Sequence, residues 1–99
     1  MTNYRRGTEK ERQAMKELER VGYTAMRTAG SHGPFDVIAV APQGIRLIQI
    51  GRVKKGNSYT GKLREAIEEI QDIPTPTGAS KEVWIWRDHK GWVEQVTIS

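Results

Sequence analysis

Residues 35–53 have the sequence FDVIAVAPQGIRLIQIGRV, in which two apolar, β-branched runs flank a short turn. The first run, residues 35–40, predicts a strand at the centre of a sheet. The proline and the glycine of Pro42-Gln43-Gly44 predict a tight turn. Residues 45–53 predict the next strand, so this stretch sets the middle of the fold.

Helical patterns flank the two strands. Thr8 and Glu11 match a capping box, and apolar residues follow at helical spacing as far as Gly22. Downstream, residues 63–70 form a second amphipathic pattern with three glutamates on its solvent side. This second helix cannot continue through Pro74, because proline removes a helical hydrogen bond.

Three further segments complete the predicted fold. Residues 23–28 predict a short strand, and residues 82–87 and 92–98 predict a hairpin. The order is α-β-β-β-α-β-β, an α/β fold with a central mixed sheet flanked by helices. We expect residues 1–99 to form a single domain.

Length and composition exclude several classes of protein. The chain has 99 residues and no cysteine, which excludes disulfides, thiolate metal sites and cysteine nucleophiles. Its longest unbroken apolar run, residues 37–41, is far shorter than a membrane span. The first residues, MTNYRR, lack the apolar stretch of a signal peptide. We expect a soluble cytoplasmic protein with no membrane partner.

Basic residues are concentrated in one part of the chain. There are 16 Lys and Arg against 12 Asp and Glu, a net charge of +4. Residues 46–64 contain six basic residues and no acidic one. Such a block predicts a polyanionic partner, with nucleic acid first, although a solvated lysine-rich loop has the same composition.

Two acidic residues are candidates for chemistry. Asp36 is the only acidic residue between Glu19 and Glu65, and it lies in an apolar strand beside a glycine-rich loop. A carboxylate there is costly unless it is paired, hydrogen-bonded or bound to a metal, so we favour a functional role over a loop-anchoring one. Glu11 lies on the inward helix face, where helix capping is the simpler explanation.

Gln49 and Gly51 lie on one face of the strand over residues 45–53, because side chains alternate along a strand. The amide oxygen of Gln49 could bind a hard cation. A glycine inside a strand costs roughly 0.5–1 kcal/mol and leaves a gap in the row of side chains. Gly51 therefore needs an explanation.

Other polar and aromatic residues are explained more simply without chemistry. Ser31 has no histidine or lysine base at a recognisable spacing, and His32 in the same loop is typical of a surface histidine. Trp84 and Trp86 share a strand face, which favours a core or dimer-interface role over base stacking.

The spacing of four segments is typical of one nuclease family: YRRGTEKER at residues 4–12, GY at 22–23, RTAGS at 27–31 and FDVIA at 35–39. Together they resemble the archaeal-type Holliday junction resolvases of the PD-(D/E)XK nuclease superfamily, over residues 4–71. The resemblance implies a restriction-endonuclease-like core and a DNA-associated prokaryotic or viral protein. It also implies homodimers that bind four-way DNA junctions and cut two strands with Mg²⁺, or with Mn²⁺ as a substitute.

The resemblance also implies roles for individual residues. Glu11, Asp36 and Gln49 would hold the metal, Ser31 would lie near the scissile phosphate, and Gly51 occupies the position where a lysine is expected. Water would attack the phosphorus in line and leave 5′-phosphate and 3′-hydroxyl ends. The hairpin tryptophans or the second helix would form the dimer face. Contacts with the DNA backbone, which recognise shape and charge, are expected from Arg5, Arg6, Arg12, Lys54, Lys55, Tyr59 and Lys62.

One departure from the family pattern affects the expected chemistry. The Glu-x-Lys pair is replaced by Gln49-x-Gly51. Glutamine keeps an oxygen but removes a negative charge, and glycine removes the ammonium that orients water and offsets phosphate charge. Arg52 points to the opposite strand face. Lys54 or Lys55 could fold back into the site if the strand ends early.

Three explanations of Gly51 stay open. The chain is an active nuclease with a displaced lysine, a natural junction binder that no longer cuts, or a nuclease with a substitution introduced at this position. A non-catalytic DNA-junction-binding module on the same fold is therefore the alternative function, and it predicts salt-dependent, metal-independent binding. A basic module for structured RNA would explain the charge block but neither acid.

Overall fold

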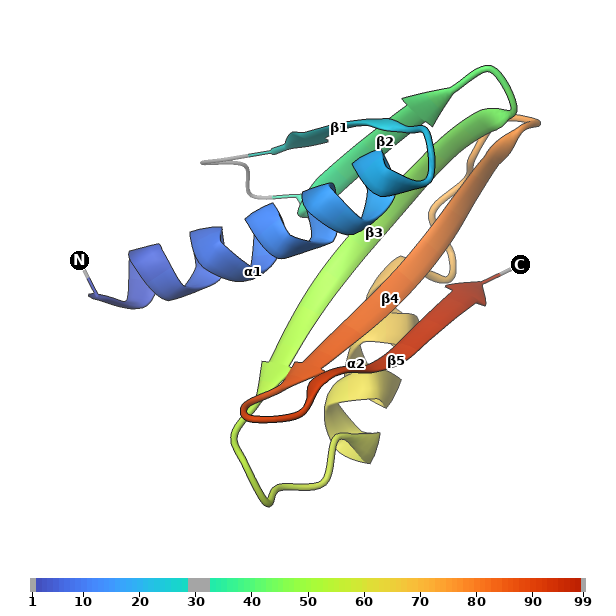
Figure 1. The fold of residues 1–99 in the computed structure, drawn as a ribbon. Helices are drawn as coiled ribbons and strands as arrows, with labels where there is room; N and C mark the ends of the chain where they lie inside the picture. The colour runs from blue at the N-terminus through green and yellow to red at the C-terminus, as the bar shows by residue number, and fades with distance from the viewer. Residues whose placement is uncertain (1, 29–32, 99) are drawn as a thin grey trace.

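The computed structural model describes residues 2–28 and 33–98, with side chains for residues 9–28 and 33–98. The elements follow the predicted order α-β-β-β-α-β-β (Figure 1). They are α1 (Thr2–Arg20), β1 (Thr24–Arg27), β2 (Val37–Ala41), β3 (Gly44–Val53), α2 (Thr60–Ile70), β4 (Ala79–Arg87) and β5 (Gly91–Ile98).

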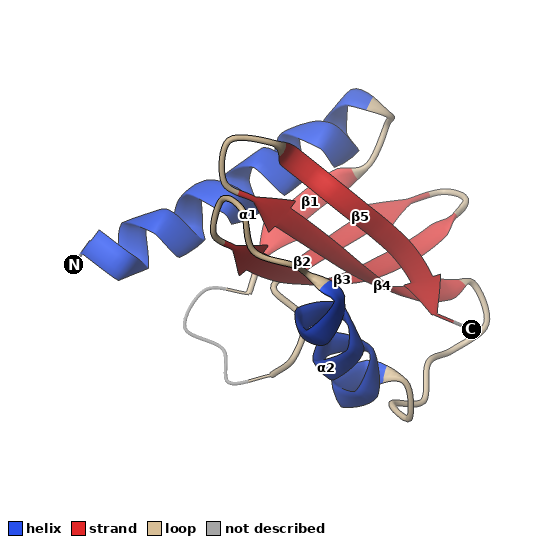
Figure 2. Ribbon diagram, turned by 90° about the horizontal axis from the view of Figure 1, so that it is seen from below, coloured by secondary structure: helices blue, strands red, loops and turns tan. Residues whose placement is uncertain are grey.

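The five strands form one mixed sheet in the order β1-β2-β3-β4-β5. Neighbouring strands are antiparallel except β3 and β4, which are parallel and are connected through α2. The two helices lie on opposite faces of the sheet (Figure 2). The predicted central strand, residues 35–40, becomes β2, and the centre is β3, because β4 and β5 are added on the far side of β3.

The face of the sheet under α1 holds the first part of the core. Ala14 and Leu18 lie one helical turn apart and are fully buried. They pack against Ile48 of β3 and Trp84 of β4. The apolar spacing seen in the sequence therefore marks the buried face of α1.

The start of α1 differs from the prediction. The helix begins at Thr2, so Thr8 lies inside it and is not its N-terminal cap. Extending an existing helix gains one hydrogen bond for each residue that is fixed, and a single glycine at position 7 costs only about 1 kcal/mol. The predicted end is confirmed, since Gly22 follows the last turn with φ of 99°.

The opposite face holds the second part of the core. Ala66 and Ile70 of α2 pack against Val83 and Ile85 of β4. Neither helix, as far as the chain is described, is long and apolar enough to cross a membrane.

A buried lysine fixes the end of α2. Lys81 of β4 is 5% exposed, and its ammonium donates hydrogen bonds to the carbonyls of Gln71 at 2.7 Å and Ile73 at 2.8 Å. Carbonyls at a helix C-terminus have no partner within the helix. Lys81 therefore attaches α2 to the sheet.

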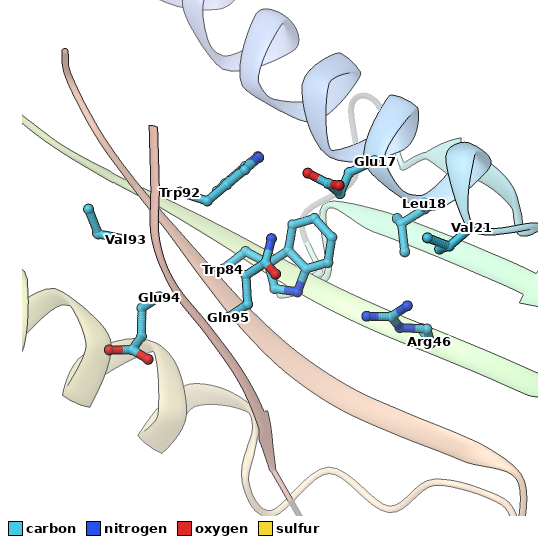
Figure 3. Close-up of a pocket in the computed structure, with 9 residues that line it drawn as sticks. All are labelled: Glu17, Leu18, Val21, Arg46, Trp84, Trp92, Val93, Glu94 and Gln95. Carbon is cyan, nitrogen blue, oxygen red and sulfur yellow. The ribbon is translucent and has the colours of Figure 1, made fainter. Parts of the chain in front are cut away.

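The hairpin tryptophans pack edge to face on the α1 side. The ring centroids of Trp84 and Trp92 are 5.3 Å apart, and those of Trp86 and Trp92 are 5.1 Å apart. Trp84 and Trp92 line a groove of about 470 Å³ beside Leu18 and Arg46 (Figure 3). Trp84 is only 1% exposed, so it belongs to the core and cannot form a dimer face.

Candidate functional site

The candidate site lies where β3 extends beyond β2. Val37 of β2 pairs with Ile48, and β3 continues to Val53 beside β4. The N–H of Asp36 donates to the Ile48 carbonyl at 2.8 Å, and its Oδ2 accepts from the N–H of Ile50 at 2.8 Å. The carboxylate thus accepts from an N–H of β3 that lies beyond the last residue paired with β2. This contact holds Asp36 against β3.

The end of β1 holds the other side of Asp36. The backbone N–H of Thr28 donates to the Asp36 carbonyl at 3.1 Å, and the Thr28 hydroxyl donates to the Phe35 carbonyl at 2.6 Å. Asp36 is therefore fixed on both sides at the beginning of β2.

Glu11 approaches the same region from α1. Its Oε1 lies 3.5 Å from Nη1 of Arg27 at the end of β1, and both side chains are half-buried. Because α1 begins at Thr2, Glu11 lies well inside the helix, and the capping explanation does not apply.

Both carboxyl groups have raised pKa values. Burial raises the pKa of Glu11, the charge of Asp36 raises it further, and Arg27 lowers it. Burial also raises the pKa of Asp36, the Ile50 hydrogen bond lowers it, and the charge of Glu69 raises it. The charge of Asp36 is therefore opposed by acids from α1 and α2, and a cation beside Asp36 would relieve that repulsion.

β3 and α2 enclose a small hollow of about 90 Å³. Gln49 and Gly51 line its strand side, as the alternation of side chains predicts, and Lys62, Glu65 and Glu69 line its helix side. The Oε1 atom of Gln49 is buried and has no hydrogen-bond partner among the described residues. The Gln49 oxygen, on the α2 side of β3, is thus an acceptor without a donor in the described part of the chain.

The oxygen atoms in this region fit a hard divalent cation. Glu11 and Asp36 offer carboxylates and Gln49 offers an unpaired amide oxygen, the donor types that Mg²⁺ takes. Within residues 9–28 and 33–98, no three acidic or histidine side chains form a cluster able to hold a metal ion. A metal here would therefore complete its coordination with water or substrate phosphate oxygens.

The residues expected to contact DNA have different surroundings. Contact with DNA stays a prediction for all of them. The exposed members are Arg12, Lys54, Lys55 and Lys62. The side chains of Arg5 and Arg6, and the whole of Ser31, lie outside the described residues. Tyr59 is half-buried, and its hydroxyl donates to Glu94 at 3.0 Å.

The hypothesis that Lys54 or Lys55 replaces the missing lysine is not supported. It required an early end of the strand, but β3 continues through Val53, and both lysines are exposed in the turn beyond it. Arg52 is bound to Asp88 by hydrogen bonds of 2.9 and 3.0 Å.

The contribution of α2 to this region was not predicted from the sequence. Glu65 and Glu69 are exposed, as predicted, but together with Lys62 they also line the hollow. Their positions, three and seven residues from Lys62, lie on one helix face. This spacing was a usable signal, but its meaning depends on how α2 packs against β3.

Comparisons with known proteins point in one direction. The family model of the archaeal Holliday junction resolvases, Hjc, matches residues 2–94. A similar solved structure is that of Hjc from Archaeoglobus fulgidus, described as a Holliday junction resolvase from an archaeal hyperthermophile. It has a TM-score of 0.57 and 23% identity, over 88% of this chain and 69% of that chain, which shows a shared fold. No curated protein matches the chain.

Proposed function

Because the chain belongs to the archaeal Holliday junction resolvase family, we propose that it is a structure-selective DNA endonuclease that resolves four-way junctions by Mg²⁺-dependent phosphodiester hydrolysis. The observation that carries this proposal is the approach of two half-buried acids: Glu11 pairs with Arg27 at the end of β1, and the Asp36 backbone is hydrogen-bonded to Thr28 directly after that strand. Pure DNA binding requires no half-buried acids, because acids repel phosphate.

The residues of the site have separate tasks in this proposal. Glu11, Asp36 and Gln49 would hold the divalent cation, which supplies Lewis-acid stabilisation of phosphate charge. The Ile50 N–H holds the carboxylate of Asp36 in place, and Arg27 holds that of Glu11. Repulsion between the two acids disfavours the metal-free state, so binding of a cation gains free energy.

The remaining parts of the proposal concern DNA and symmetry. Arg12, Lys54, Lys55 and Lys62 would contact the DNA backbone from exposed positions on α1, the turn after β3 and α2. Such contacts recognise the shape and charge of a junction. A homodimer would place two sites about a two-fold axis, which matches paired cuts on a symmetric junction.

Cleavage of a labelled synthetic four-way junction tests the proposed function. The wild-type chain and Asp36→Asn are incubated with the junction in Mg²⁺, in Mn²⁺ and in EDTA, beside a plain duplex and a hairpin RNA. We expect metal-dependent paired cuts in the junction by the wild-type chain only. Equal cutting by the Asp36→Asn variant, or equal cutting of the duplex, would contradict the proposal.

A non-catalytic junction-binding module is the second candidate, and Gly51 is the observation that favours it. It predicts tight binding that weakens steeply with salt, with no effect of metal and no cleavage. The same experiment separates the two functions, because the module would bind the junction in EDTA and leave it intact in Mg²⁺ and Mn²⁺.

A further inference from the structure

Gly51 lets Ile85 and Lys62 approach β3 closely. It is buried, and its φ lies outside the left-handed range that demands glycine. A Cβ atom at this position would lie 2.8 Å from Cδ1 of Ile85, 3.2 Å from Cγ of Lys62 and 3.4 Å from Cε of Lys62. The space where a side chain of residue 51 would begin is therefore bordered by the alkyl stem of a lysine from α2.

The position of α2 explains why Lys62 reaches this space. Lys62 lies one helical turn before Ala66, which is buried against the sheet together with Ile70. Its stem packs beside Gly51 while the residue as a whole stays exposed, as is typical of lysines that keep their ammonium in water. The residue also lines the hollow on whose strand side Gln49 and Gly51 lie.

The ammonium of Lys62 is uncommitted. It forms no ion pair within the described part of the chain. Lys81, the other lysine on this face, is buried and bound to the carbonyls at the end of α2. Lys62 is therefore a lysine that can offer its charge to a substrate here.

We propose that Lys62 supplies, from α2, the ammonium that β3 lacks at position 51. This inference rests on the proposed nuclease function and adds a catalytic residue to it. In the hydrolysis, the oxygen of water bonds to phosphorus and the bond from phosphorus to O3′ breaks. One water proton ends on O3′ and the other is released. Lys62 contacts the phosphate, orients the water and offsets the charge that develops in the transition state.

The packing crowds the two lysine positions. With Lys62 in place, any side chain at residue 51 meets the Lys62 stem at 3.2 Å and the Ile85 methyl at 2.8 Å. Removing the Lys62 stem relieves the first of these contacts, and the Ile85 methyl must still rotate away. Glycine at 51 thus gives Lys62 room beside β3, and a lysine at 51 needs both a shortened Lys62 and a rotated Ile85.

The test is single-turnover cleavage with protein in excess, so that all junctions are bound before metal is added. Lys62→Ala is expected to slow cleavage by about 10²–10³-fold, the effect of losing one transition-state donor. Its affinity for the junction should fall only by the effect of one lost phosphate contact. The slope of the logarithm of the binding constant against the logarithm of the salt concentration should decrease in magnitude by about 1. Arg64→Ala is the control, because it removes an equal charge from an exposed position of the same helix.

Two rescues distinguish catalysis from folding. The chain has no cysteine, so Lys62→Cys can be alkylated at one position with 2-bromoethylamine. The thiolate displaces bromide and gives a side chain that ends in an ammonium at nearly the length of lysine. This treatment should restore cleavage, and so should Gly51→Lys combined with Lys62→Ala. Far-UV circular dichroism confirms that each variant is folded.

Several outcomes would overturn the role of Lys62. They are cleavage by Lys62→Ala at the wild-type rate, a loss explained by weaker binding, and folded alkylated Lys62→Cys that stays inactive. A wild-type chain that binds junctions and cuts none in either metal would refute the nuclease function itself, and the role of Lys62 with it. That failure is distinguishable, because Arg64→Ala would be equally inactive.

Discussion

Asp36 combines a structural contact with an unfavourable charge. Its Oδ2 pairs the N–H of Ile50, while burial and the charge of Glu69 raise its pKa. An amide of the same shape keeps an acceptor for Ile50 and removes the charge. The two contributions of Asp36 can therefore be separated by one substitution.

Asp36→Asn should leave the metal-free protein at least as stable as the wild-type chain, because a buried negative charge is removed. Cleavage should fall by more than the roughly 10–100-fold that the loss of a supporting group costs. Thermal unfolding with and without Mg²⁺ should show metal stabilisation in the wild-type chain and none in the variant. Asp72→Asn, at an exposed position after α2, is the control. Persistent stabilisation by Mg²⁺ in Asp36→Asn would exclude Asp36 as a ligand.

Glu82 is the opposite case, a buried acid with good partners. Burial acts to raise its pKa, but hydrogen bonds from Arg46, Trp84 and Ser80 outweigh burial and hold the pKa below its ordinary value of 4.5. Arg46 donates to its two oxygens at 2.6 and 2.8 Å. An acid whose pKa is lowered by folding stabilises the fold above its unfolded pKa, and this contribution disappears as pH falls through the folded value.

Glu82→Gln should lower the free energy of unfolding by about 2–3 kcal/mol at neutral pH, because Arg46 loses its charged partner. Urea denaturation at a series of pH values measures the difference from the wild-type chain. The difference should be constant above the ordinary pKa and should shrink at lower pH. Glu68→Gln, on the exposed face of α2, should show neither effect. A difference that does not depend on pH would show that pairing is not its cause.

At the level of elements, local sequence patterns predicted the features that depend on neighbouring residues in the chain. Residues 35–53 have the alternation and the turn of two paired strands, and β2 and β3 are found there. The predicted start of α1 was wrong. The pattern from Thr8 to Glu11 is a local signal for a helix cap, whereas helix extension is cooperative. The approach of the Lys62 stem to Gly51 could not be predicted. It depends on how α2 packs against the sheet, and neither sequence segment alone contains that information.

The attachment of α2 by Lys81 is the prediction at this scale. Lys81→Met keeps the apolar stem but leaves the carbonyls of Gln71 and Ile73 without their donor. We expect a loss of about 1–3 kcal/mol in the free energy of unfolding. Hydrogen exchange should be faster at the C-terminal end of α2, and Lys90→Met, at an exposed turn, should change neither measurement. Unchanged protection in α2 would mean that Lys81 does not hold this helix end.

At the scale of the whole molecule, an apolar area of the sheet is left uncovered by the described part of the chain. Met26, Val40 and Ile45 are 44%, 40% and 37% exposed. They lie on β1, β2 and β3, on the sheet face opposite α1, together with Ile38 and Leu47. α2 packs against β3 and β4 and leaves this area open (Figure 2). Exposed apolar patches of this kind mark interaction sites, so this face is a better candidate for the proposed dimer contact than Trp84, which is buried, whereas Trp86 and Trp92 are partly exposed.

Val40 and Ile45 face each other across β2 and β3, which permits a charge-neutral test of this contact. Val40→Lys combined with Ile45→Glu places opposite charges on adjacent strands, which preserves the pairing within one chain. Between two chains, the charged side chains replace the apolar contact. Sedimentation velocity should show a dimer for the wild-type chain and a dissociation constant about 100-fold weaker, roughly 2.7 kcal/mol, for the double variant.

Val21→Lys is the control, because Val21 is 58% exposed but lies at the end of α1, away from the patch. Loss of the dimer should convert paired cuts into single nicks, since paired cuts need two sites on one junction. A variant that stays dimeric while the wild-type chain is a dimer would move the contact to another surface, and a monomeric wild-type chain that makes paired cuts would refute the symmetric arrangement.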